Sequence, residues 1–153
     1  MAGTSLSEIY DLMLMKVTDY RLLDLFDTSQ TDFENYLQAW LKFAIVDFSN
    51  TCNQDLTFDN TTKEFLVTLN LDNQVILATL MMKHWLSKDV NDVTQFRLHV
   101  GDRDFKTPSE AQNLREKSTY YNIVKEECSQ MLIDYAYGKN DWTSWFAQNF
   151  AGG

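Results

Sequence analysis

Histidine and cysteine, the residue types that most often hold metals or act as nucleophiles, are scarce in this chain. The two histidines, His84 and His99, lie neither near a cysteine nor in a metal-ligand spacing. Cys128 falls on an apolar stripe and has no base beside it in the sequence that could activate a thiolate. The pattern therefore favours a protein that is not an enzyme and that needs no cofactor and no metal.

Carboxylates are the third kind of reactive group, and they are plentiful. The 153 residues carry 22 Asp and Glu against 13 Lys and Arg, which gives a net charge of -9. Ten of the carboxylates lie between Met1 and Asn60, where three basic side chains accompany them. Such a density is typical of a solvated acidic face. A small acid-metal enzyme stays open as an alternative, because paired carboxylates cannot be recognised without geometry.

The net negative charge of the chain disfavours partners that are rich in phosphate. Tight binding to nucleic acid or to acidic membranes needs clustered Lys and Arg, and Gly101 stands alone where a phosphate loop would need several glycines. The longest apolar run, Val75 to Met82, is too short to span a bilayer. No secretory signal is visible, and Cys52 and Cys128 fit reduced thiols in a cytoplasmic setting.

A cluster of aromatic side chains stands near the C-terminus. It comprises Trp142, Trp145, Phe146 and Phe150. Each of these side chains forgoes a few kcal/mol of burial if it stays in water, and aromatic residues supply much of the binding energy at interfaces. Two interpretations stay open: the segment folds back over the chain's own core, or it docks on a neighbouring subunit or another protein. We expect docking, with residues 1–138 as a helical bundle domain and residues 139–153 as a partner-docking tail.

The elements that position these residues are predicted to be helices, because five glycines and one proline are too few for the many turns of a β-sandwich. Ser5-Leu-Ser-Glu8 and Thr31-Asp-Phe-Glu34 are capping boxes that open amphipathic segments. The first helix could continue past Thr18 toward Phe26. The second helix is predicted to run from Asp32 to about Ser49.

A polar stretch from Asn50 to Lys63 interrupts the helices. Phe65 to Leu69 is expected to be extended, and whether it pairs as a strand stays open. Asp72 is predicted to cap the next helix. Apolar residues cover nearly the whole circumference of this helix between Val75 and Leu86, so it should be the central buried helix.

The last predicted helix, Thr107 to Tyr137, is the longest. Thr107-Pro-Ser-Glu110 is a capping box with proline at the first helical position, and Gly138 suits a helix end. Its apolar stripe consists of Tyr121, Val124, Cys128, Met131 and Tyr135. Its first half, Gln112 to Thr119, is polar and is expected to project beyond the core.

A projecting loop is expected between Asp89 and Lys106, around Gly101. Its charged members are Arg97, Asp102, Arg103 and Asp104. Together these expectations describe an all-α fold: a bundle of four or more helices with a long C-terminal helix, a projecting loop and an extended aromatic C-terminal tail.

Three segments resemble the head-to-tail connector, or adaptor, proteins of tailed bacteriophages. They are Asp72 to Leu86, the loop to Lys106, and Phe105 to Leu114 leading into the helix that ends at Gly138. The likeness covers roughly residues 65–138 and is one of layout. It implies a ring of identical subunits, commonly twelve, beneath the portal. Such a ring extends the DNA channel and links the portal to the tail.

The resemblance also implies partners and a location. The chain would be a virion protein of the neck, made in the host cytoplasm, and it would contact the portal protein and tail or neck proteins. The loop would meet the next protein down the tail, and the aromatic segment would reach the portal or an adjacent subunit. An acidic channel wall would let DNA pass without specific binding, and no membrane is involved. The alternative is an acidic soluble binding or regulatory protein, a DNA-mimic inhibitor, whose N-terminal carboxylates face a basic partner.

Overall fold

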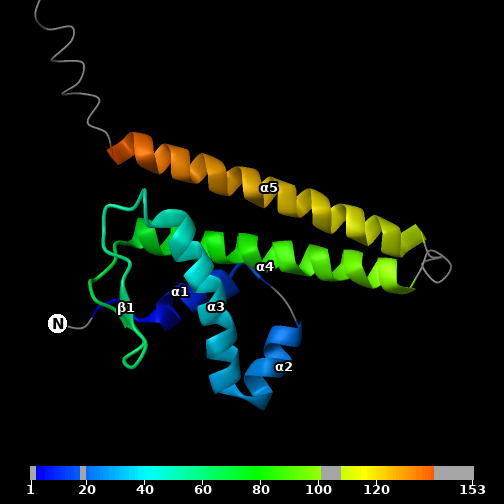
Figure 1. Ribbon diagram of the computed structural model, residues 1–153, viewed down its shortest axis with the longest axis horizontal. Helices are drawn as coiled ribbons and strands as arrows, with labels where there is room; N and C mark the ends of the chain where they lie inside the picture. The colour runs from blue at the N-terminus through cyan, green and yellow to red at the C-terminus, as the bar shows by residue number, and fades with distance from the viewer. Residues whose placement is uncertain (1–2, 18–19, 101–107, 140–153) are drawn as a thin grey trace, which may run out of the picture.

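The computed structural model describes residues 3–17, 20–100 and 108–139 of the chain. Five helices and one two-stranded hairpin make up these residues, so the predicted helical class is confirmed for this part of the chain (Figure 1). The elements in chain order are α1 (Leu6–Leu14), α2 (Tyr20–Thr28), α3 (Gln30–Phe48), β1 (Phe58–Asp59), β2 (Glu64–Phe65), α4 (Leu71–Val100) and α5 (Pro108–Lys139).

Helix α1 begins where the sequence predicts, with Ser5 and Glu8 forming the capping box. It does not continue toward Phe26, because the chain turns tightly after Leu14. The backbone N–H of Lys16 donates to the carbonyl of Met13 at 2.9 Å, which closes the last turn. A separate helix, α2, follows.

Helix α3 begins two residues before the predicted Asp32. Its N-cap is Ser29, whose hydroxyl accepts a hydrogen bond from the backbone N–H of Asp32 at 3.3 Å. The predicted cap, Thr31, already lies within the helix. Its apolar face packs inward, with Phe33, Leu37, Leu41, Ala44 and Phe48 buried.

The hairpin answers the open question about the strand. β1 and β2 pair antiparallel, with Phe58 opposite Phe65, and Ser5 adds an isolated bridge to Glu64. The pairing therefore includes Phe65, the first residue of the segment expected to be extended, but does not run on to Leu69. Gly3 lies so close to this edge that an added Cβ would stand 1.7 Å from the carbonyl oxygen of Phe65.

Helix α4 is the centre of the bundle, as the sequence predicts. Its N-cap is Asn70 rather than Asp72, since the side chain of Asn70 accepts from the backbone N–H of Asn73 at 2.9 Å. The helix contacts α1, α3 and α5. Its buried apolar residues are Ile76, Leu77, Ala78, Leu80, Met81, Met82, Trp85 and Leu86.

The expected loop from Asp89 to Lys106 is largely wrong, because α4 continues to Val100. No glycine or proline lies between Leu71 and Val100, so this stretch lacks the residues that most strongly disfavour a helix. Asp89, taken as the start of the loop, is buried, and its carboxylate accepts from the ammonium of Lys117 on α5 at 2.9 Å. Arg97 therefore lies on a helix, whereas Asp102, Arg103 and Asp104 lie outside the described residues.

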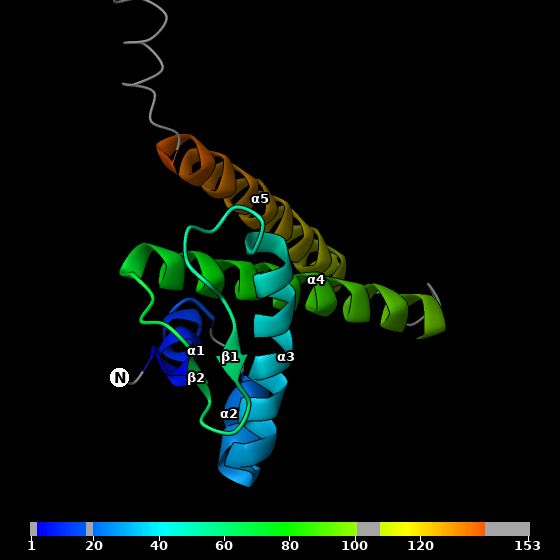
Figure 2. The same ribbon diagram turned by 60° about the vertical axis from the view of Figure 1, so that its left-hand side comes forward.

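Helices α4 and α5 run side by side as a long hairpin that extends beyond α1, α2 and α3 (Figures 1 and 2). Val124 and Cys128 of the predicted stripe are buried, and Tyr121, Met131 and Tyr135 pack against the core. Gly138 does not end α5 but lies within it, because the helix continues to Lys139. The expected cap at Thr107 lies outside the described residues.

Candidate docking surface

Two apolar side chains on α3 face solvent instead of the core. The exposed fraction is 54% for Phe43 and 70% for Val46. Both are out of phase with the buried stripe of α3. Exposed apolar side chains that cluster beside a hollow are typical of interaction sites, and a hollow flanks Phe43 on each side. We name this region the Phe43 groove.

The first hollow of the Phe43 groove lies between α3 and the hairpin and has a volume of about 580 Å³. A polar network forms one wall: the ammonium of Lys63 donates to Gln38 at 2.6 Å, and the amide of Gln38 donates to Asn60 at 2.7 Å. Lys63 has a φ of 58°, a left-handed conformation that costs a side-chain-bearing residue free energy. Together with Lys42 it places two cations beside Phe43 and Val46.

The second hollow lies where α3, α4 and α5 meet and has a volume of about 480 Å³. Phe43 lines both hollows. Phe43 lies over His84, with 5.4 Å between ring centroids, and 6.0 Å from the ring of Trp40. Tyr121 of α5 completes the lining. The Phe43 groove is therefore aromatic on one side of α3 and basic on the other.

Asp47, one turn after Phe43, holds His84, which lines the second hollow. Its carboxylate accepts from Lys83 at 2.7 Å and from Nε2–H of His84 at 2.6 Å. Burial alone would raise the pKa of Asp47, but the hydrogen bonds and charges of Lys83 and His84 bring that pKa below its ordinary value. His84 is therefore a hydrogen-bonded histidine on α4. We interpret this group as a clamp between α3 and α4.

Replacing Asp47 with Asn is expected to lower the free energy of unfolding by about 1–2 kcal/mol at neutral pH, because two partly buried hydrogen-bond donors, Lys83 and His84, lose their carboxylate acceptor. A depressed carboxylate pKa stabilises the fold above the unfolded-state value of about 3.9, and the contribution disappears as the pH falls through the folded value. Urea unfolding should therefore show a difference from the unmodified chain at pH 7 that shrinks near pH 3.

Asp92→Asn is the matched control for this measurement. Asp92 pairs with Lys88 on the surface of α4, where an ion pair contributes less than about 1 kcal/mol. An Asp47→Asn effect no larger than that of Asp92→Asn, or one that grows on acidification, would contradict the clamp.

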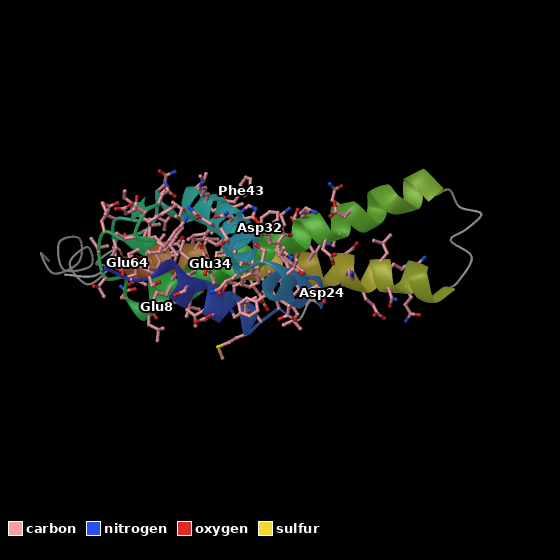
Figure 3. The ribbon with its side chains drawn as sticks, turned by 90° about the horizontal axis from the view of Figure 1, so that it is seen from below. Glu8, Asp24, Asp32, Glu34, Phe43 and Glu64 are labelled. Atoms are coloured by element: carbon pink, nitrogen blue, oxygen red, sulfur yellow. The ribbon has the colours of Figure 1, made fainter. Side chains whose placement is uncertain are left out.

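A second charged region is acidic. Glu8, Asp24, Asp32, Glu34 and Glu64 come from three helices and the hairpin, and Figure 3 labels them in the view from below. Burial, and then the negative charge of Glu34, raise the pKa of the Tyr10 hydroxyl. Four of these carboxylates, all but Glu64, belong to the first sixty residues, where the sequence concentrates its acidic side chains.

Reactive side chains do not converge in the part of the chain that the structure describes. No three His, Cys, Asp or Glu side chains there could hold a metal ion. Cys52 and Cys128 form no disulfide, and burial raises the pKa of the Cys128 thiol. Cys128 packs between α5 and α4, as the apolar stripe predicts. The geometry at the Phe43 groove suits binding by apolar contact and charge.

The predicted docking residues belong to the C-terminal aromatic segment. Trp142, Trp145, Phe146 and Phe150 lie outside the residues that the structure describes, so their role stays a prediction. Phe43 and Val46 were missed at the level of sequence. Their signal was available, since they are large apolar residues that fall off the repeat of Leu37, Leu41 and Ala44.

Comparisons with protein families, curated proteins and solved structures find no match to this chain. The phage-connector resemblance therefore rests on the sequence alone. In the ranges 3–17, 20–100 and 108–139, no helix combines the length and apolar character needed to cross a bilayer.

Proposed function

We propose that this chain is an assembly protein, a subunit of a head-to-tail connector of tailed bacteriophages. Helix α5 carries the proposal. One face of it packs on α4 through Val124 and Cys128. Away from this face, α5 also carries exposed apolar side chains, Ile123 and Ile133, with exposed fractions of 48% and 47%. A helix that is apolar on both sides needs a second partner.

The two ends of α5 also support a role in assembly. At its first end α5 lies beside α4 and extends with it beyond the other helices. After its last residue, Lys139, the sequence continues into the aromatic residues of the predicted tail. A projecting hairpin and an aromatic segment at opposite ends of one rod suit a subunit that contacts proteins on two sides. Contacts between different surfaces of identical copies close into rings when the rotation per subunit allows it.

In the proposed connector, identical subunits form a ring, with twelve implied by the resemblance, between the portal and the tail. The aromatic segment docks on the portal side or on an adjacent subunit. The acidic residues from Glu8 to Glu64 suit a wall along which DNA moves without specific binding. The chain has no catalytic role in this proposal.

Truncation after Gly138 is expected to leave the fold intact and to weaken assembly at least about 100-fold, because two or more aromatic anchors of about 2 kcal/mol each are lost. The core cluster consists of residues between Leu6 and Cys128, so it does not depend on the removed segment. Mass in solution and negative-stain images, with and without a candidate portal protein, measure assembly.

A full-length variant with Ala at Trp142, Trp145, Phe146 and Phe150 is the control for chain length. It should fail to assemble in the same way as the truncated chain. Rings or portal complexes that form as well without these side chains would refute the docking role.

The acidic region of Figure 3 favours one alternative, an acidic regulatory protein that binds a basic partner. The two functions differ in their response to salt. Exposed charges separated by more than about 8–10 Å are screened at physiological ionic strength, so a complex made by the acidic region dissociates as salt rises. Docking through aromatic side chains persists.

A further inference from the structure

An apolar hollow of about 440 Å³ lies where α1, α2 and α3 meet. Its apolar walls are Leu14, Val17, Leu22, Leu23, Phe26 and Phe33. The rings of Phe26 and Phe33 meet edge to face with 5.2 Å between centroids, which holds α2 against α3. Leu23 is 56% exposed and Phe26 is 47% exposed, so the hollow is open to solvent on the α2 side. An open apolar hollow of this size is typical of a binding site. We name it the Phe26 hollow.

Carboxylates border the Phe26 hollow. Asp11 lines it from α1 and is exposed. Asp27 is exposed and lies one turn after Leu23 on the same side of α2. Among the side chains that the structure describes, neither Asp11 nor Asp27 takes part in an ion pair. A complementary partner therefore offers apolar side chains with positive charges beside them.

The Phe43 groove carries this combination. Phe43 and Val46 are both more than half exposed, and Lys42 and Lys63 line the same hollow with them. The contacts of the Phe43 ring with His84 and Trp40 hold it in place before any partner arrives. A side chain that is already ordered loses little conformational entropy on binding. The chain thus contains both halves of a complementary contact.

One copy cannot join its own two surfaces. Phe33 in the Phe26 hollow and Phe43 in the groove belong to the same helix, α3, and ten helical residues rise about 15 Å. Phe33 faces the core, whereas Phe43 faces solvent. The Phe43 ring of one copy can therefore reach only the hollow of another copy. A contact between two different surfaces leaves one of each free on every pair, so copies can follow one another into a ring or a filament.

We propose that Phe43 and Val46 of one copy insert into the Phe26 hollow of a second copy, with Lys42 and Lys63 beside the carboxylates that border it. Apolar burial stabilises this contact, and the charges set its orientation. The contact itself does not depend on the proposed function. Only the closed ring of a connector, built by repeating it, rests on that function.

Mixing two full-length variants tests the proposal. Val46→Asp blocks the inserting side chains, and Leu23→Asp blocks the hollow; both positions are more than half exposed, so the fold should tolerate the change. Each variant alone should self-associate at least about tenfold more weakly than the unmodified chain. An equal mixture should form pairs that stop at two copies, because one variant keeps its inserting side chains and the other keeps its hollow. Sedimentation velocity measures the mass of each sample.

Leu71→Asp is the matched control, because Leu71 is 65% exposed and lines neither surface. It should associate like the unmodified chain, and all three variants should keep the helical circular dichroism. An unmodified chain that stays a single copy up to about 1 mM would overturn the proposal. So would a mixture that forms no pairs, or Leu23→Asp that associates undiminished. A chain that stays single but binds a synthetic helix of leucine and lysine would assign the hollow to a different protein, and would also overturn it.

The two proposals fail separately. The mixing experiment uses the isolated protein with its aromatic segment intact, whereas the docking role is measured by assembly with a portal protein. Variants that pair on mixing, in a chain whose alanine variant still assembles on the portal, would keep the contact and refute the docking role. Variants that do not pair, in a chain whose alanine variant loses the portal, would refute the contact alone.

Discussion

Phe48→Ala is expected to lower the free energy of unfolding by about 3–5 kcal/mol, the range for removing a buried aromatic ring. Phe48 has no exposed surface, and it lies where the end of α3 meets α5. The cavity left by the ring would remove the edge-on contact with Tyr135. It would also loosen the part of α5 from which the aromatic segment continues.

Chemical denaturation monitored by far-UV circular dichroism measures this loss. Phe43→Ala is a matched control, because it removes the same side chain from the same helix at a position that is 54% exposed. It should cost less than about 1 kcal/mol. Similar losses for the two variants would mean that α3 does not present Phe48 to the core and Phe43 to solvent.

Gly3→Ala is expected to cost about 2–4 kcal/mol, although it adds a single methyl group. The new Cβ would stand 1.7 Å from the carbonyl oxygen of Phe65 and 3.1 Å from that of Val67. Both atoms belong to the backbone, so no side chain can rotate away. The N-terminal edge would have to separate from β2, and the hydrogen bond from the N–H of Phe65 to the carbonyl of Thr4, now 2.8 Å, would be lost.

Gly138→Ala provides the opposite case in the same protein. Gly138 lies within α5 and has no atom within 4 Å of an added Cβ. Alanine should therefore stabilise the chain slightly, by about 0.5 kcal/mol, through helix propensity. Thermal unfolding of the two variants should move in opposite directions. A neutral Gly3→Ala variant would show that residues 3–5 do not pack on β2.

Elements that depend on neighbouring residues in the sequence could be predicted, whereas elements that depend on contacts between distant residues could not. The capping box at Ser5 and the central position of α4 were predicted correctly, because a cap and an all-round apolar segment are local patterns. The caps of α3 and α4 were misplaced by two residues each. Ser29 and Asn70 compete there with Thr31 and Asp72, and only the geometry of the preceding turn decides between them.

The loop predicted after Asp89 failed for a different reason. Mixed charge was interpreted as a sign of irregular structure, but α5 supplies the partner that keeps Asp89 on a helix, through Lys117. That contact joins residues far apart in the sequence. The Phe43 groove was missed in the same way, since its walls come from α3, the hairpin, α4 and α5. No local pattern predicts where such segments meet.

Helix α4 belongs both to the bundle and to the helical hairpin that α4 and α5 form beyond it. From Leu71 to Val100 it contains no glycine or proline, the residues at which helices most often bend sharply. It therefore acts as a stiff lever whose inner arm is embedded among α1, α3 and α5. A displacement of the outer arm would move the inner arm with it, and the contact of Asp47 with Lys83 and His84 is where α3 would resist that movement.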